Sequence, residues 1–552
     1  MIPRVRLILD YNSFFDENPP ENRISIIKGI SRKYILFEIS ALNYRLKKKT
    51  NLFYDTSLER QLNEFKYFCG IDNSLLNFYT NRFTKYIVNP KDYPLVFNRA
   101  ANLFAMEEII NCDELKDIED FKMSRIDVWD SILKYLLSIN TLITNYENIK
   151  KEKPTLEELN APSLVLNELL IEDNPLLDAY KGIKLIDYFQ KHKLYCEPLY
   201  NYFNEVVKSE PKRFIFDILS LYISNQSEDS DLEFFYHTKE ENKALEFFST
   251  NRIKNKNIHT LLSIKKCPFY KDKKNTYIIL DINFLINKTF NFLINDFWFD
   301  YLKKQKDDKG NEIYSFQDFK GAVGYFYEEY VREIFDNCFS YYKHPKPLLF
   351  DELKIDTSKG KIEIADIYLR QNKKILVGQV KSGTIYDKEK YAGEMQLLYQ
   401  NNRDDFFDNF GVNQLIKSIH NIINHYNKFD SKLEVNKQLH FYPILIFSDK
   451  IFRTPLFSNV FNERFQELLI QNNFGNNIVH PLTVINISEL ETIEYYLAKK
   501  TFTIWDLLNS HYQNKRIVPP FYNTVYKFIK YHFLLEKVEL TLKSIFVSPE
   551  DN

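Results

Sequence analysis

The stretch Lys361–Gly383, KIEIADIYLRQNKKILVGQVKSG, predicts two β-strands joined by a short polar turn. Strand side chains alternate between two faces, so one face of the first strand, Lys361–Leu369, carries Ile362, Ile364, Asp366 and Tyr368. The residues Gln371–Lys374 are typical of a turn. On the second strand, one face carries Ile375, Val377, Gln379 and Lys381.

Pairing of these strands predicts that polar side chains gather at one end of a sheet. If Gln371–Lys374 form the loop, Asp366 lies opposite Gln379. A two-residue loop would instead place Asp366 opposite Val377, with Gln379 as its diagonal neighbour. In either register an acid, an amide and the ammonium of Lys381 converge at the end of an otherwise apolar face.

This combination suits a divalent metal site. A hard cation such as Mg²⁺ prefers oxygen ligands and keeps several waters. A lysine beside such a site can orient a water molecule or offset charge that develops on a phosphate.

The motif resembles that of the PD-(D/E)XK nuclease superfamily, with Asp366 on one strand and Gln379-Val380-Lys381 on the next. The superfamily usually adds a glutamate from a preceding helix, and the segment GYFYEEYVREIF supplies Glu328, with Glu329 as the alternative. The sequence departs from the common pattern in two ways. No proline precedes Asp366, and glutamine replaces the commoner acid at position 379.

The resemblance implies a restriction-endonuclease-like α/β domain, with a mixed sheet flanked by helices. It implies that Glu328, Asp366 and Gln379 hold one or two Mg²⁺ or Mn²⁺ ions, with the Val380 carbonyl as a further ligand. Lys381 would position or activate the attacking water. The implied reaction is phosphodiester hydrolysis of nucleic acid, with DNA as the expected substrate, in bacterial restriction or anti-phage defence.

Other residues are weaker candidates. Asp387 and Glu389 are the acids that would replace Glu328 if that choice is wrong, whereas Glu363 falls on the face opposite Asp366. Candidate phosphate or site contacts are Gln396, Tyr399, Gln414, Lys417, Lys450 and Arg453. Both His420 and His425 are interpreted as packing or surface residues.

Composition limits the class of protein. The chain has 552 residues, of which 44% are hydrophobic and 16% aromatic, enough for two or more domains with large cores. Its 74 basic and 75 acidic residues nearly cancel, which argues against indiscriminate binding of nucleic acid. A local excess of basic residues between His344 and Lys390 suits a phosphate-facing surface.

The five cysteines are scattered and form no C-x-x-C motif, which predicts free thiols and no zinc site. The N-terminal sequence lacks a signal-peptide pattern, and no apolar run is long enough to span a bilayer. We therefore expect a cytoplasmic protein without a membrane partner. Assembly into a homo-oligomer, or with a protein encoded nearby, stays open.

Two domains are predicted. Residues 1–255 should be mostly helical, with a short N-terminal β segment made of the runs VRLILDY, RISIIKGI and KYILFEI. The boundary is expected between the polar stretch Asn225–Asp231 and Pro268, and residues 265–552 should form the nuclease-like α/β domain. The helical half carries no ligand cluster, so its predicted role is regulation, targeting or oligomerisation.

Two alternatives to a nuclease remain. The chain is either a catalytically inactive nucleic-acid-binding module that keeps the nuclease fold, or an interaction protein that acts through its helical half. Metal titration with site variants distinguishes the first alternative from an enzyme, and deletion of the helical half tests the second.

Overall fold

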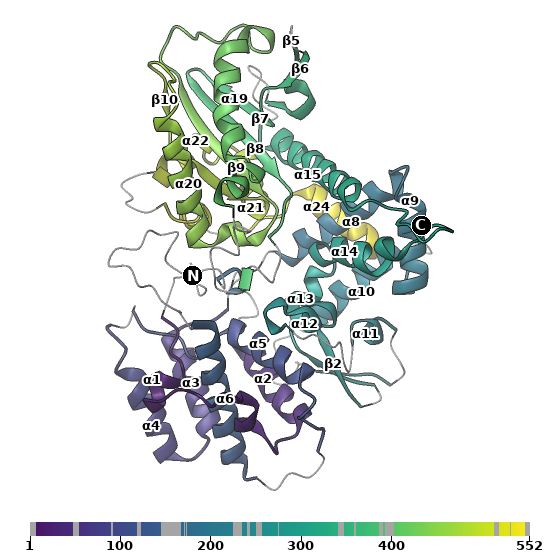
Figure 1. The fold of residues 1–552 in the computed structure, drawn as a ribbon, viewed down its shortest axis with the longest axis vertical. Coiled ribbons are helices and arrows are strands. Elements are labelled where there is room, and N and C mark those ends of the chain that lie inside the picture. The colour runs from purple at the N-terminus through teal and green to yellow at the C-terminus, as the bar shows by residue number, and fades with distance from the viewer. Residues whose placement is uncertain are drawn as a thin grey trace.

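The structure is a computed structural model of the 552-residue chain. It describes residues 7–47, 54–89, 92–118, 123–144, 167–170, 172, 174–224, 235–239, 243–249, 257–273, 275–339, 347–357, 360–385, 390–391, 402–512, 518–529 and 531–546. The N-terminal half is helical and the C-terminal half contains a mixed sheet flanked by helices (Figure 1).

The N-terminal helices form the lower lobe in Figure 1 around one hydrophobic core. They are α1 (Tyr11–Phe15), η1 (Arg23–Ile27), α2 (Arg32–Leu46), α3 (Leu58–Cys69), α4 (Asn73–Thr84), α5 (Arg99–Asn111) and α6 (Arg125–Thr144). Side-chain caps begin several of them: Asp10 caps α1, Asn22 caps η1 and Ser57 caps α3. The left-handed residue Gly70 ends α3.

The predicted N-terminal β segment is wrong. The runs RISIIKGI and KYILFEI fall on η1 and α2. In the described part of VRLILDY, residues 7–10 precede α1 and make only an isolated bridge between Ile8 and Leu95. Short apolar runs do not distinguish a buried helix from a strand. In this case packing decides, because α2 buries residues all round its axis, including Ile35, Leu36 and Glu38.

A second group of elements joins the two halves. It comprises η2 (Asn167–Leu170), α8 (Pro175–Lys191), α9 (Cys196–Asn201), η3 (Tyr202–Val207), α10 (Pro211–Ser224), α11 (Lys243–Phe247), η4 (Ile258–Thr260), α12 (Leu262–Lys266), α13 (Ile282–Asn287), α14 (Asn291–Asp296), η5 (Phe297–Tyr301) and η6 (Leu302–Lys304). A small antiparallel sheet in the order β1-β3-β2 lies among them, formed by β1 (Phe235–His237), β2 (Phe269–Lys273) and β3 (Thr276–Ile279).

Hydrophobic cores cross the boundary expected between residues 225 and 268. The helices α8 and α10 share a core with elements of the C-terminal half, whereas β2, β3 and α13 also contribute residues such as Tyr270 and Phe284 to the N-terminal core. The two halves are therefore joined through packed side chains.

The central sheet has the strand order β10-β9-β8-β7-β4, and β11 also pairs with β9. Its strands are β4 (Leu348–Leu349), β7 (Ile367–Gln371), β8 (Lys374–Lys381), β9 (His440–Phe447), β10 (Ile478–Val479) and β11 (Thr483–Asn486). The strand β8 is antiparallel to β7 and parallel to β9. A separate two-stranded sheet pairs β5 (Lys354–Thr357) with β6 (Gly360–Glu363).

Helices cover both faces of the central sheet. On one face, α19 packs with Ile375 and Val377 of β8, whereas Leu376 faces the core that contains α15. The remaining elements of this half are α15 (Phe316–Phe339), η7 (Phe350–Leu353), α18 (Arg403–Asn409), α19 (Val412–His425), η8 (Tyr426–Lys428), η9 (Lys450–Arg453), α20 (Pro455–Ile470), α21 (Ile487–Ala498), α22 (Ile504–Tyr512), α23 (Tyr522–Phe528) and α24 (Glu536–Phe546).

The predicted first strand of the hairpin is interrupted. Residues 361–363 belong to β6, the chain leaves strand geometry at 364–366, and β7 begins at Ile367. In the hairpin β7–β8, Arg370 pairs with Ile375 and Ile367 with Gly378, so the register is the one that directs Asp366 toward Gln379. The turn itself spans only residues 372–373, with Asn372 at a φ of 55°. The prediction that a two-residue loop would place Asp366 opposite Val377 is therefore wrong.

Candidate functional site

Asp366 lies at the end of the hairpin, just before β7. Its backbone N–H donates to the Gly378 carbonyl at 3.1 Å, and its Oδ2 accepts the Val380 N–H at 2.7 Å. The sheet edge thus fixes both the backbone and the carboxylate of this residue. The contact that the structure shows for Val380 runs through its N–H, whereas the sequence predicted a role for its carbonyl.

The Gln379 amide is buried beside Asp366, with 5% of the residue exposed. One amide atom lies 3.0 Å from Asp366 Oδ2 and 3.2 Å from Gln414 Oε1, and the other lies 3.3 Å from Ser418 Oγ. A nitrogen in the first position donates to both oxygens. An oxygen there would face only acceptors, an arrangement that a cation would stabilise.

Lys381, the last residue of β8, is held by the first turn of α19. Its Nζ donates to Gln414 Oε1. Gly411, with φ of 87°, permits this approach, because a Cβ there would lie 2.6 Å from Lys381 Cε. Burial lowers the pKa of the Lys381 ammonium, while the charges of Asp366 and Glu363 partly oppose that shift.

Glu328 approaches the same edge of the sheet from α15. The turn before it comes close to the end of β8, since a Cβ on Gly324 would lie 3.5 Å from Ser382 Oγ. Burial and the nearby charge of Asp366 raise the pKa of Glu328 to about 7. Burial also raises the pKa of Asp366 to about 6, although the Val380 N–H and Lys381 oppose the shift.

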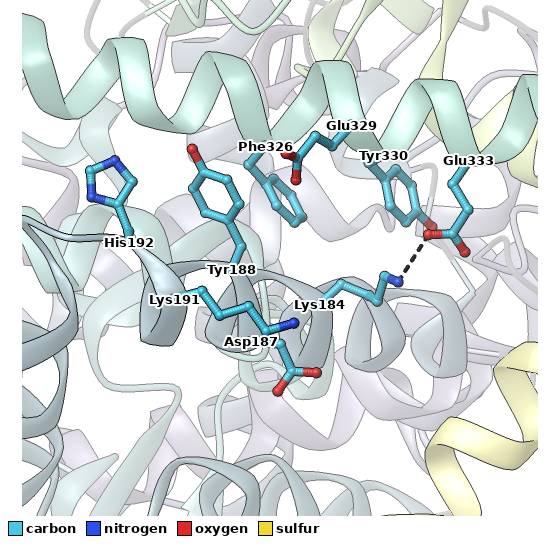
Figure 2. A pocket seen from close by; sticks show the side chains of 9 residues that line it. All are labelled: Lys184, Asp187, Tyr188, Lys191, His192, Phe326, Glu329, Tyr330 and Glu333. Atoms are coloured by element: carbon cyan, nitrogen blue, oxygen red, sulfur yellow. Dashed lines mark ion pairs between the residues drawn. The ribbon is translucent and has the colours of Figure 1, made fainter.

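Glu329 faces away from this cluster. It lines a cavity of about 400 Å³ between α8 and α15, together with Tyr188 and the ion pair of Lys184 with Glu333 (Figure 2). The structure therefore places Glu328, rather than its neighbour, within electrostatic range of Asp366.

The sequence analysis did not predict that the charge of Glu363 affects the pKa values of the site residues. Because the chain breaks between β6 and β7, the simple alternation of faces does not extend from Asp366 back to Glu363. Glu363 is exposed, and its charge raises the pKa values of Glu328, Asp366 and Lys381. An acid three residues before Asp366 was the available signal, but the assumed continuous strand concealed it.

Of the remaining candidate residues, one joins the site, several have other contacts, and several lie outside the described residues. Gln414 joins the cluster, while Lys417 is an exposed cation on the same helix. His420 packs against Phe474. Lys450 donates to Asn287 at 3.4 Å. Arg453 is buried 3.8 Å from Glu489, in a structural role. The alternatives Asp387, Glu389, Gln396 and Tyr399 lie outside the described residues.

Glu328, Asp366 and Gln379 offer the kind of ligand atoms that a hard divalent cation prefers. Two carboxylates and an amide are oxygen donors of the type that Mg²⁺ and Mn²⁺ take. Within the described ranges, no group of three or more His, Cys, Asp or Glu side chains is arranged to hold a metal ion. A cation here would thus rely on Glu328, Asp366 and the Gln379 amide, with water completing its coordination.

Two further observations concern other classes of site. All five cysteines are free thiols. Among the helices of the described residues, none has the length and apolar character needed to cross a membrane.

Comparison with known proteins provides no relative. No family model, curated protein or solved structure matches the chain.

Proposed function

We propose that the chain is a divalent-metal-dependent nuclease of the PD-(D/E)XK type that hydrolyses phosphodiester bonds, with DNA as the favoured substrate. The observation that carries the proposal is that Asp366, Gln379 and Lys381 meet at the carboxyl end of β8, with Glu328 of α15 close enough for the charge of Asp366 to raise its pKa. These residues come from α15, from the position before β7 and from β8, and their types follow the superfamily pattern except for the glutamine at position 379.

The residues have distinct roles in this proposal. Glu328, Asp366 and Gln379 would hold Mg²⁺ or Mn²⁺, which would polarise the scissile phosphate when bound. Lys381 would orient the attacking water and offset negative charge on the phosphate. Gln414 would hold the Lys381 ammonium in position, because its Oε1 accepts from Nζ.

The raised pKa values of both carboxyls support a metal site. Burial is the main reason that both acids are costly to ionise, and a cation would stabilise their charged forms. A role in restriction or anti-phage defence, in the cytoplasm, follows only from the resemblance of fold and motif.

One observation favours a second candidate, a nucleic-acid-binding module without catalysis. The Gln379 amide can donate hydrogen bonds to both Asp366 and Gln414, so these three side chains are paired without a cation.

A substrate panel distinguishes the two. Purified chain is incubated with linear and circular duplex DNA, single-stranded DNA and RNA, with Mg²⁺, Mn²⁺ or EDTA. A nuclease cleaves at least one substrate only with metal, and Lys381→Ala abolishes that cleavage. Metal-independent binding of a substrate without cleavage would support the inactive module instead.

A further inference from the structure

The segment that leaves the candidate site enters the core of the N-terminal half. Tyr391, which follows β8, is 4% exposed and belongs to the hydrophobic core of the N-terminal helices. Its ring lies edge-on to Phe104 of α5, with centroids 6.0 Å apart, and the Lys265 ammonium lies 5.1 Å from its centroid. A residue of the C-terminal half is thus anchored in the other half.

Glu168 of η2 makes polar contacts with Tyr391 and with its neighbour Lys390. The Tyr391 hydroxyl donates to Glu168 Oε1, and the Lys390 ammonium lies 3.7 Å from Oε2. The next residue, Leu169, packs in the N-terminal core, and its carbonyl accepts from Arg99 Nη1 at 2.6 Å. The N-terminal half therefore fixes the position of Glu168.

Asp449 connects the anchor to the end of β8. Lys390 donates to Asp449 Oδ1 at 2.8 Å, and the Ile385 N–H donates to Oδ2 at 3.1 Å. The side chains of Lys390 and Asp449 are only 10% and 5% exposed. Next to Asp449, the Ser448 N–H donates to the Lys381 carbonyl at 3.3 Å.

We propose that Tyr391 and Glu168 are positioning residues for Lys381, so that the N-terminal helical half completes the candidate site. The relay runs from Glu168 through Lys390 and Asp449 to the backbone that carries Lys381. Buried charges retain favourable energy only in a narrow geometry, so the relay restrains the end of β8. The catalytic part of this inference rests on the proposed nuclease function.

Two measurements test the positioning without catalysis, in the full chain. The first is backbone hydrogen exchange across residues 380–385. The second is the acylation rate of Lys381, mapped by mass spectrometry and normalised to Lys374 at the other end of β8. The variants are Tyr391→Ala, Tyr391→Phe and Glu168→Ala. The matched control is Tyr200→Ala, since Tyr200 is 64% exposed.

Hydrogen exchange and acylation should rank the variants in the same order. Exchange near Ile385 and acylation of Lys381 should rise about tenfold or more in Tyr391→Ala and Glu168→Ala, because a lost partner frees the relay. Tyr391→Phe keeps the ring and loses the hydroxyl, so it should show a smaller rise. Unchanged exchange and acylation in folded Tyr391→Phe and Glu168→Ala would overturn the proposal.

The activity readout separates positioning from mere folding. With an active substrate, kcat should fall about 10- to 100-fold in Glu168→Ala while KM and the Mn²⁺ requirement stay near wild type, because a displacement of about 1 Å has such an effect. An unchanged kcat would overturn the catalytic part. If the wild type cleaves nothing, the nuclease proposal fails, and exchange and acylation still decide whether the N-terminal half positions Lys381.

Discussion

At the scale of single residues, the atoms of the Gln379 amide define the chemistry of the site. The position near Asp366 is 3.0 Å from a carboxylate oxygen, so without a cation it suits the amide nitrogen as a hydrogen-bond donor, and with a cation it would suit the amide oxygen as a ligand. Binding of a metal would therefore require the amide to rotate. The hairpin register predicted this pairing, whereas the partner Ser418 comes from a helix whose approach the motif does not encode.

Substitution of Gln379 tests its role as a ligand. Gln379→Glu supplies charged oxygen and should lower the Mg²⁺ concentration needed for half-maximal cleavage. Gln379→Leu keeps similar bulk without an oxygen and should raise that concentration about tenfold or more. A Mg²⁺ titration of each variant measures both effects. Wild-type behaviour of the Leu variant would leave Gln379 as a packing residue.

The raised pKa of Glu328 predicts a cost in stability. Its pKa rises from the usual 4.5 to about 7 in the folded chain. Between these values the folded chain binds the proton more tightly, so without metal its stability decreases as pH increases through the interval. Glu328→Gln should therefore stabilise the chain at pH 8, by about 1–2 kcal/mol after discounting for solvent, and by nothing near pH 4.

Thermal unfolding in EDTA at the two pH values measures this difference. Glu329→Gln is the matched control, since Glu329 is the exposed neighbour that faces the other cavity. An equal effect of both substitutions at pH 8 would contradict the raised pKa that burial and the charge of Asp366 give Glu328.

At the scale of elements, the first turn of α19 shapes the site. The amphipathic helix α19 spans Val412–His425. Its position over Gln379 and Lys381 depends on a glycine contact between distant segments, which no local pattern reveals. The N-terminal runs were wrongly predicted as strands for a related reason. Their apolar residues indicate burial, but they do not show whether the buried element is a strand or a helix.

Gly411→Ala should disturb Lys381 directly. The new Cβ would lie 2.6 Å from Lys381 Cε, so the cost combines a left-handed backbone with a steric clash, about 2–4 kcal/mol in total. Gly310→Ala is the matched control, because Gly310 has a similar φ of 81° and open space around it, with an expected cost of about 1–2 kcal/mol. Chemical denaturation measures both, and equal costs would contradict the close approach.

At the scale of the whole molecule, buried polar contacts join the two halves. Arg99 of α5 pairs with Asp281, which caps α13, at 2.6 Å, and Lys47 donates to Asn283 at 2.6 Å. The sequence predicted a helical half followed by an α/β half, and that coarse order is confirmed. It could not predict the contacts between them, because pairing between residues far apart in sequence leaves no local periodicity.

Removal of the Arg99 charge should loosen this junction. Arg99→Met leaves Asp281 buried without its cation, which costs about 3–5 kcal/mol. Arg82→Met removes an exposed pair with Asp16 and should cost about 0–1 kcal/mol. Urea unfolding followed by fluorescence compares them. Equal destabilisation would show that the buried pair does not hold the halves together.

Metal-dependent cleavage is the decisive test of the proposed nuclease site. Cleavage of duplex and single-stranded DNA is followed as Mn²⁺ is titrated into the wild-type chain, Asp366→Asn and the control Asp318→Asn, which alters an exposed acid on α15. We expect cleavage that saturates with Mn²⁺ in the wild type and the control, and none in folded Asp366→Asn. Cleavage by Asp366→Asn at the wild-type rate would contradict the nuclease proposal. So would the absence of cleavage by all three proteins at every Mn²⁺ concentration.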